Sequence, residues 1–187
     1  IEIPSKRSIE SSMIYVIVAN VAHIQNILEI TKNADLKVSV IDIPELALLN
    51  VFESLPSPNK TRVFISFQND ATQLIIFKNK KLLFMRRLDL VYQKSQNLEK
   101  ILNDVALQVQ RSLDYCSSNI MDVSSATIYL DLNEPNPDLP EKLSAILGLR
   151  VVYFDIKELL DIEYSEKIPH NYTSLASVGG ILRANVI

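Results

Sequence analysis

The sequence predicts an α/β fold in which a group of antiparallel strands is followed by alternating helices and strands. Three observations point to it. Residues 61–91 contain three consecutive runs rich in β-branched and aromatic residues, separated by short polar turns. Residues 95–118 then place apolar side chains at every third or fourth position, the pattern of an amphipathic helix. After them, strand-like runs alternate with further helical patterns, which is typical of α/β proteins.

The first part of the chain predicts a strand–helix–strand unit. Residues 13–19 form the longest apolar run and predict a buried strand. Asn20 can cap the helix that follows. We expect one face of that helix to pack inward; it carries Ile24, Ile27, Leu28, Thr31 and Ala34. Residues 37–42 predict a second strand, which a right-handed crossover would join to the first.

A further helix and a boundary come next. Pro44 suits the first turn of a helix that we expect to continue to about Ser54. The stretch 55–59 is rich in Pro, Ser and Asn, which favours a boundary between two parts of the chain. We therefore expect residues 1–54 to form the strand–helix–strand unit with a connecting helix, and residues 55–187 to form a second unit.

The second unit predicts the order strand, strand, strand, helix, strand, helix, strand, helix. Asn69-Asp70 and Asn79-Lys80 are suitable hairpin turns between the first three strands. The expected elements are strands at 61–68, 73–78, 81–91, 126–131 and 150–154, and helices at 95–118, 141–147, 156–160 and 172–184. Gly179 and Gly180 fall inside the last helix, where we expect close approach to another backbone. This order is the lobe architecture of the ribonuclease H-like and actin-like folds.

Composition excludes several classes of function. The net charge of −3 argues against a duplex-binding surface, so we expect no nucleic-acid partner. The three glycines form no P-loop or dinucleotide-binding motif, and the two histidines lie too far apart in sequence to favour a histidine metal site or a catalytic triad. We expect no catalytic residues, no bound metal and no direct membrane insertion. The single cysteine, Cys116, lies in a helical stripe and predicts a buried structural thiol.

Three segments resemble one family of proteins. They are VIDIPELALLN at 40–50, VQRSLDY at 109–115 and ASVGGILR at 176–183. In this order they resemble the PilM family of actin-like type IV pilus assembly proteins, and within it most closely the MshI proteins of the mannose-sensitive haemagglutinin pilus. The resemblance implies an actin-like, ribonuclease H-like ATPase fold. It also implies that the family's first lobe begins upstream of Ile1, so that this chain is incomplete on its N-terminal side.

The same resemblance implies a degenerate nucleotide site. In ATP-binding members the first hairpin turn follows the pattern Asp-x-Gly-x-x-x-Thr, whereas this chain has Ser66 and Gln68 at the first two motif positions and keeps only Thr72. The loop after the strand at 126–131 normally carries two glycines, whereas this chain has Asn133 and Glu134. Bulky and acidic side chains would then stand where the phosphates and the purine bind. We expect no cofactor and no ATPase activity.

The resemblance implies a cytoplasmic scaffold that sits at the bacterial inner membrane through its partners. The expected partner is a single-span inner-membrane protein of the PilN or MshJ kind, with the assembly ATPase as a further candidate. The segments at 13–19 and 21–33 would supply part of the groove for the partner's cytoplasmic tail. Two alternatives remain: an ATP-binding protein whose other phosphate loop lies outside this chain, and the equivalent scaffold of a type II secretion system.

A metal-dependent nuclease is a rival hypothesis. Asp42, Asp131 and Asp155 each end a predicted strand, and ligand sites of open α/β sheets lie beyond such ends. Three carboxylates there could hold two Mg²⁺ ions for phosphodiester cleavage. The alternative is that these aspartates cap or precede the helices that follow. We favour capping, because Asp42 precedes the boundary and no basic surface is available for a nucleic acid.

Overall fold

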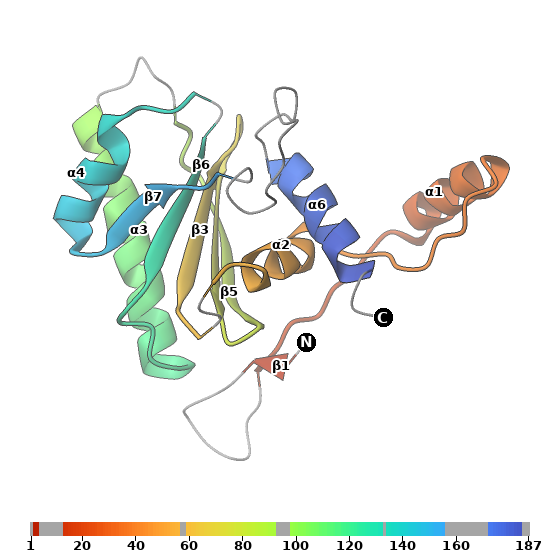
Figure 1. The fold of residues 1–187 in the computed structure, drawn as a ribbon, viewed down its shortest axis with the longest axis horizontal. Coiled ribbons are helices and arrows are strands. Elements are labelled where there is room, and N and C mark those ends of the chain that lie inside the picture. Colours follow the sequence, from red (N-terminus) through yellow and green to blue (C-terminus); the bar gives the residue numbers. More distant parts are fainter. Residues whose placement is uncertain are drawn as a thin grey trace.

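A computed structural model describes residues 2–3, 13–56, 59–92, 98–132, 134–155 and 172–184. Its centre is a five-stranded sheet with the strand order β5-β4-β3-β6-β7 (Figure 1). The helix expected at 156–160 and the residue Asn133 lie outside the described residues. The other elements of the second unit are present in the predicted order.

The first three strands form the predicted antiparallel meander. Their bounds are Arg62–Phe67 for β3, Thr72–Lys78 for β4 and Lys81–Leu88 for β5. Asn79 and Lys80, between β4 and β5, both have positive φ angles of 51° and 60°. Two consecutive residues with positive φ are typical of a type I′ turn, whose twist matches that of the flanking strands. This turn therefore fixes the register of the second hairpin.

Two parallel strands extend the sheet on the other side of β3. The strand β6 (Thr127–Leu132) pairs in parallel with β3, and β7 (Arg150–Tyr153) pairs in parallel with β6. Parallel neighbours need crossover connections, which α3 and α4 provide. The carboxyl ends of β3, β6 and β7 therefore meet at one edge of the sheet.

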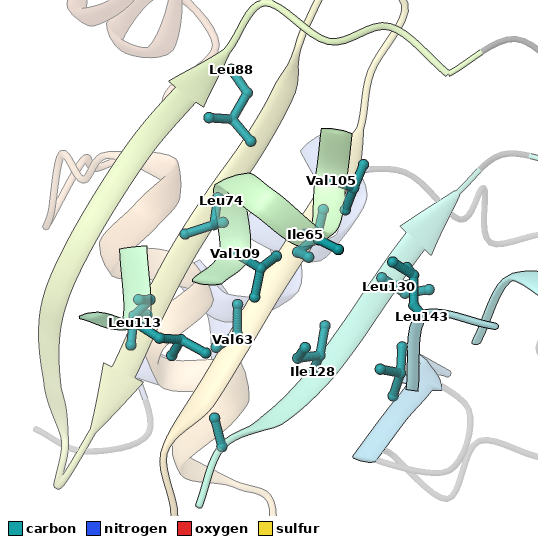
Figure 2. Close-up of a cluster of buried hydrophobic side chains, with 14 of the residues drawn as sticks. Val63, Ile65, Leu74, Leu88, Val105, Val109, Leu113, Ile128, Leu130 and Leu143 are labelled. Carbon is teal, nitrogen blue, oxygen red and sulfur yellow. The ribbon is translucent and has the colours of Figure 1, made fainter. Parts of the chain in front are cut away.

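One face of the sheet is covered by α3 (Leu98–Asn119) and α4 (Asp138–Leu147) (Figure 1). The predicted inner stripe of the long helix is confirmed: its buried members are Leu102, Val105, Val109, Ser112 and Cys116. Figure 2 shows Val105 and Val109 among side chains of the sheet such as Val63 and Ile65. This cluster is the larger of the two apolar cores.

The opposite face is covered by α2 (Pro44–Glu53) and α6 (Tyr172–Ala184). Phe52 of α2 is at the centre of an aromatic cluster, with ring centroids 5.1 to 5.4 Å from those of Phe77, Phe154, Tyr129 and Phe64. Such edge and offset contacts add to the free energy gained from burial alone. The helix α2 therefore belongs to the same core as the sheet.

The two helices on this face cross at very close range. A Cβ atom placed on Gly179 would lie 1.9 Å from the carbonyl oxygen of Ala47, a distance that no real Cβ contact shows. Asn50 Nδ2 donates a hydrogen bond to the Gly179 carbonyl oxygen at 3.0 Å. The expected close backbone approach is confirmed at Gly179. At Gly180 it is wrong, because nothing lies within 4 Å of the corresponding position.

The first part of the chain differs from the prediction. The strand residues that the structure describes there are Glu2–Ile3 (β1) and Met13–Ile14 (β2), which pair with each other in antiparallel orientation. Residues 15–20 and 36–43 form no strand, so the strand expected at 13–19 is confirmed only at Met13–Ile14 and the strand expected at 37–42 is wrong. A strand needs a hydrogen-bonded neighbour, and neither segment has one here. The boundary at 55–59 and the division into two units stay predictions.

The helix between those segments forms as predicted, but the face that we expected to pack inward is not buried. Asn20 caps α1 (Val21–Asn33) by accepting a hydrogen bond from the Ala22 N–H, yet no residue of α1 is buried. Figure 1 shows α1 standing apart from the sheet at the end of two extended stretches. We call residues 15–43 the N-terminal arm. Its exposed large apolar side chains are Val16, Ile17, Val18, Val21, Ile27, Leu28, Ile30, Leu36, Val38, Val40 and Ile41.

Candidate functional site

The hairpin turn and the loop that the sequence assigned to one site lie side by side. In the parallel pairing of β3 with β6, Phe67 is opposite Leu132. Gln68 follows Phe67 directly, and Glu134 comes two residues after Leu132. The turn 68–71 and the start of the loop after β6 therefore share the edge where the carboxyl ends of the parallel strands meet. Open α/β sheets place their ligands at such an edge.

Two of the polar residues at this edge are already paired with each other. Ser66 Oγ donates a hydrogen bond of 2.7 Å to Asp131 Oδ2, and both side chains are buried. A hydrogen bond to a buried carboxylate stabilises the fold because an unpaired charge there would be costly. The hydrogen bond therefore links the end of β3 to the end of β6. At the position where ATP-binding members carry an aspartate, Ser66 offers no carboxylate and instead donates a hydrogen bond to one oxygen of Asp131.

The turn itself uses its polar groups internally. The Gln68 N–H donates to the Ala71 carbonyl oxygen at 2.9 Å, and Thr72 Oγ1 donates to the Leu90 carbonyl oxygen at 2.7 Å. Phosphate loops present backbone N–H groups to the ligand. Here the N–H of Gln68 and the hydroxyl of Thr72 both have partners within the protein. Glu134 is exposed.

The structure separates the three aspartates of the nuclease hypothesis. Asp131 is the next-to-last residue of β6, and Asp155 comes two residues after the neighbouring parallel strand β7, so both lie near strand ends as predicted. Asp42 ends no strand: its Oδ2 pairs with Arg183 of α6, and its Oδ1 accepts a hydrogen bond from the Ile43 N–H. Within the described residues, no group of three His, Cys, Asp or Glu side chains could hold a metal ion.

The arm is anchored to the rest of the molecule near both of its ends. Tyr15 OH donates to the Leu83 carbonyl oxygen of β5 at 3.3 Å, and the Asp42–Arg183 ion pair joins the far end to α6. Burial raises the pKa of Tyr15 to about 12, because its ring lies against the core and the phenolate would lose solvation. Of the segments 13–19 and 21–33, which the resemblance assigned to partner binding, all but Met13 and Ile14 thus belong to an exposed extension with defined attachment points.

Cys116 is the buried thiol that the sequence predicted. Its side chain lies in the core between α3 and the sheet, and burial raises its pKa to about 12. The reactive form of cysteine is the thiolate, which this environment disfavours. Cys116 therefore fits a packing role.

One large cavity lined by described residues was not predicted. It has a volume of about 700 Å³ and lies over the starts of β3 and β6 and along β7 to Asp155, on the face that carries α2. A smaller cavity of about 330 Å³ lies between Phe67, Tyr92 and the first turns of α3. Neither cavity has Gln68 or Glu134 in its lining. The loss of ATP binding at the hairpin edge therefore stays a prediction.

Comparison with solved structures shows the fold. A chain of a PilM-PilN type IV pilus biogenesis complex superposes with a TM-score of 0.57 at 16% identity; the match covers 83% of this chain and 57% of that one. The chain thus spans just over half the length of that relative. A protein with actin-like ATPase fold and unknown function from Bacteroides thetaiotaomicron gives a TM-score of only 0.41, at 16% identity over 64% of this chain and 44% of the other.

The expected mixed α/β architecture and the PilM-like fold are thereby confirmed, whereas the finer likeness to MshI proteins stays a prediction. The sequence matches no protein-family model and no curated protein. Within the described residues, no helix combines the length and the apolar character needed to cross a bilayer.

Proposed function

We propose that this chain is a non-catalytic, actin-fold scaffold of a type IV pilus assembly machinery. The observation that carries the proposal is the shared fold with a chain of a PilM-PilN complex over 83% of this chain. The three family-like segments agree with it: the first leads into α2 and covers most of it, and the other two lie within α3 and α6, so all three fall on helices that pack on the sheet. The scaffold would stand on the cytoplasmic side of the inner membrane, held there by a PilN-like protein.

The hydrogen bonding at the hairpin edge supports a non-catalytic role. A phosphate-binding turn needs free N–H donors and room for the ligand, and an actin-like ATPase also needs a carboxylate to hold Mg²⁺ through water. In this chain the Gln68 N–H is bonded to Ala71 and the Ser66 hydroxyl is bonded to Asp131. Calorimetry with Mg²⁺ and ATP should therefore give no saturable heat. Saturable binding would favour the alternative of an ATP-binding protein.

The exposed arm supports binding of a partner's cytoplasmic tail. A soluble monomer seldom exposes many neighbouring apolar side chains without a binding function. The arm presents them from α1 and from both flanking stretches, and it is attached to the body at Tyr15 and Asp42. We infer that the tail of a PilN-like protein covers this surface, either along α1 or along an extended stretch.

The test is capture of such a tail by the full chain. Substituting Val18 and Ile30 together by Glu should abolish capture, since these side chains are 88% and 60% exposed and the change places charge on the apolar surface. Ile181→Glu is the matched control, because Ile181 is 68% exposed but lies on α6. Equal capture by all three proteins would place the tail elsewhere. Substitution is sharper than removal of residues 1–54, because α2 carries the buried residues Leu48 and Phe52.

The particular machine is also part of the proposal. The family-like segments favour the mannose-sensitive haemagglutinin pilus and a partner of the MshJ kind, with the scaffold of a type II secretion system as the alternative. Tails of the corresponding inner-membrane proteins from each machine can be compared in one titration. Tighter binding of the secretion-system tail would replace the pilus assignment and leave the scaffold role intact.

A further inference from the structure

The cavity of about 700 Å³ is lined by several basic side chains. Arg62, Thr127 and Arg150 stand in one row across β3, β6 and β7, because Arg62 is opposite Thr127 and Thr127 is opposite Arg150. Lys60 lines the same cavity just before β3, and Asp155 is the one acidic side chain among the described residues of the lining. The cavity therefore carries an excess of positive charge within a protein whose net charge is −3.

Only part of this charge has a partner within the part of the chain that the structure describes. Arg62 Nη2 donates to the carbonyl oxygens of Leu55 and Pro56 at 3.2 and 2.7 Å, so Arg62 holds the chain that leaves α2. Among the described residues, by contrast, no carboxylate forms an ion pair with Lys60 or Arg150, and both side chains are exposed. These two cations are available to a negatively charged ligand.

The cavity also borders a free strand edge. In the described sheet β7 is the last strand and pairs only with β6. The Phe154 N–H donates to Leu130 of β6, so alternation along the strand directs the N–H groups of Val151 and Tyr153 toward the open edge. An open edge of this kind can accept one more strand from a partner.

We propose that the open edge of β7, together with the basic cavity beside it, binds an extended acidic peptide segment of a partner protein. The added strand would place a carboxylate opposite Arg150, where cross-strand neighbours lie about 5 Å apart. Its next side chain on the same face would pack against Val152, which lines the cavity on the same side as Arg150. The segment is therefore one in which acidic and apolar residues occupy alternate positions of the cavity-facing side.

This surface is distinct from the arm. It is formed by β7 and the start of β3, on the part of the molecule that the arm does not reach in Figure 1. Its partner would therefore bind at the same time as a tail on the arm.

The test uses the full chain and short fluorescein-labelled peptides, followed by fluorescence anisotropy. The probe is a peptide with glutamate and valine on the cavity-facing side. A peptide with lysine in place of glutamate should bind at least about tenfold more weakly, the effect of one lost charge-assisted contact. Methylation of alternate backbone nitrogens should also abolish binding, because it removes the strand pairing without changing the charge.

Two charge-reversal variants distinguish a contact at Arg150 from general electrostatic attraction of the peptide to the protein. Arg150→Glu should weaken binding of the glutamate peptide at least about tenfold. Arg111→Glu, which makes the same charge change at an exposed position of α3 on the opposite face, should leave it unchanged. Hydrogen exchange should show that the peptide protects the amides of Val151 and Tyr153.

Three results would overturn the proposal. The first is no binding of the glutamate peptide, or equal binding of the lysine peptide. The second is equal weakening by the two charge reversals, which would mean general electrostatic attraction. The third is unchanged exchange at Val151 and Tyr153, or full binding of the methylated peptide, either of which would exclude strand addition.

Discussion

The strands of the sheet and the extended stretches of the arm are alike in sequence but differ in structure. Both are apolar runs rich in Val and Ile. In β3, Val63, Phe64 and Ile65 are fully buried, with a neighbouring strand on each side. In the arm, Val16 and Val18 are exposed and residues 15–20 form no strand. The difference lies in the neighbours that each segment finds.

A helix and a strand respond differently to the absence of neighbours. The helix α1 closes its own hydrogen bonds and carries its own cap at Asn20, so it forms even where nothing packs on it. The stretches on either side of α1 would need hydrogen bonds from another segment to become strands. Local sequence therefore predicts the exposed helix well and the flanking strands poorly.

The largest effect should come from truncating matched apolar residues in the two regions. Phe52→Ala removes a ring that is 1% exposed and contacts four other aromatic rings, and should lower the free energy of unfolding by about 4 kcal/mol. Ile30→Ala in the arm should change it by less than about 0.5 kcal/mol. Chemical denaturation measures both. Similar losses for the two variants would mean that the arm is packed in solution.

The next effect concerns the crossing of α2 and α6. Gly179→Ala should cost about 3 kcal/mol, because the added methyl group would overlap the Ala47 carbonyl oxygen and the helices would have to move apart. Gly180→Ala is the control in the next position of the same helix. It should stabilise the protein by about 1 kcal/mol, since nothing lies near the new methyl group and alanine favours helix. Two variants of equal stability would contradict the observed crossing.

Alkaline pH should test the buried thiol. Burial raises the pKa of Cys116 from its usual value of 9.0 to about 12, so the unfolded chain releases this proton at lower pH than the folded protein does. The resulting stability is fully present below pH 9 and is lost as the pH rises toward 12, with a slope of about 1.4 kcal/mol per pH unit. Urea denaturation across this pH range should show that the free energy of unfolding falls less steeply with pH in Cys116→Ala than in the unchanged protein. An unchanged slope would mean that the thiol is accessible to solvent.

The smallest effect should come from the turn between β4 and β5. Lys80 has a φ of 60°, which glycine adopts without steric cost. Lys80→Gly should therefore stabilise the hairpin by about 0.5 kcal/mol, measured as a small rise of the denaturation midpoint. Lys81→Gly is the control, because Lys81 is exposed in the strand and its substitution should be destabilising. The predicted result is a higher denaturation midpoint for Lys80→Gly and a lower one for Lys81→Gly.

Much of the fold could be predicted because its signals are local. Each signal can be recognised from residues close together in the sequence. Examples are the cap at Asn20, Pro44 at the start of α2, the turn at Asn79-Lys80 and the three-to-four-residue spacing of apolar side chains along α3. The strands of the arm could not be predicted correctly, because an apolar run does not reveal whether a neighbouring strand exists. Similarly, a pair of glycines did not reveal that only Gly179 lies at the helix crossing.

The candidate site was predictable in outline only. The family resemblance implied a site at the hairpin turn and the loop after β6, and these two segments do share one edge of the sheet. The Ser66–Asp131 hydrogen bond joins residues 65 positions apart and depends on the register of β3 with β6, which the sequence alone does not fix. The one available signal was a serine and an aspartate near the ends of otherwise apolar strands. The basic cavity was missed because its lining comes from separate segments.

The central claim is that the body of the molecule is a rigid, non-catalytic frame and that the arm receives the partner. Hydrogen exchange of the full chain, with and without the cytoplasmic tail of a PilN-like protein, tests it most directly. The account predicts new protection across residues 15–43 and little change in the amides of β3, β4 and β6. Protection confined to the hairpin turn 68–71 and the loop after β6, with none in the arm, would contradict it.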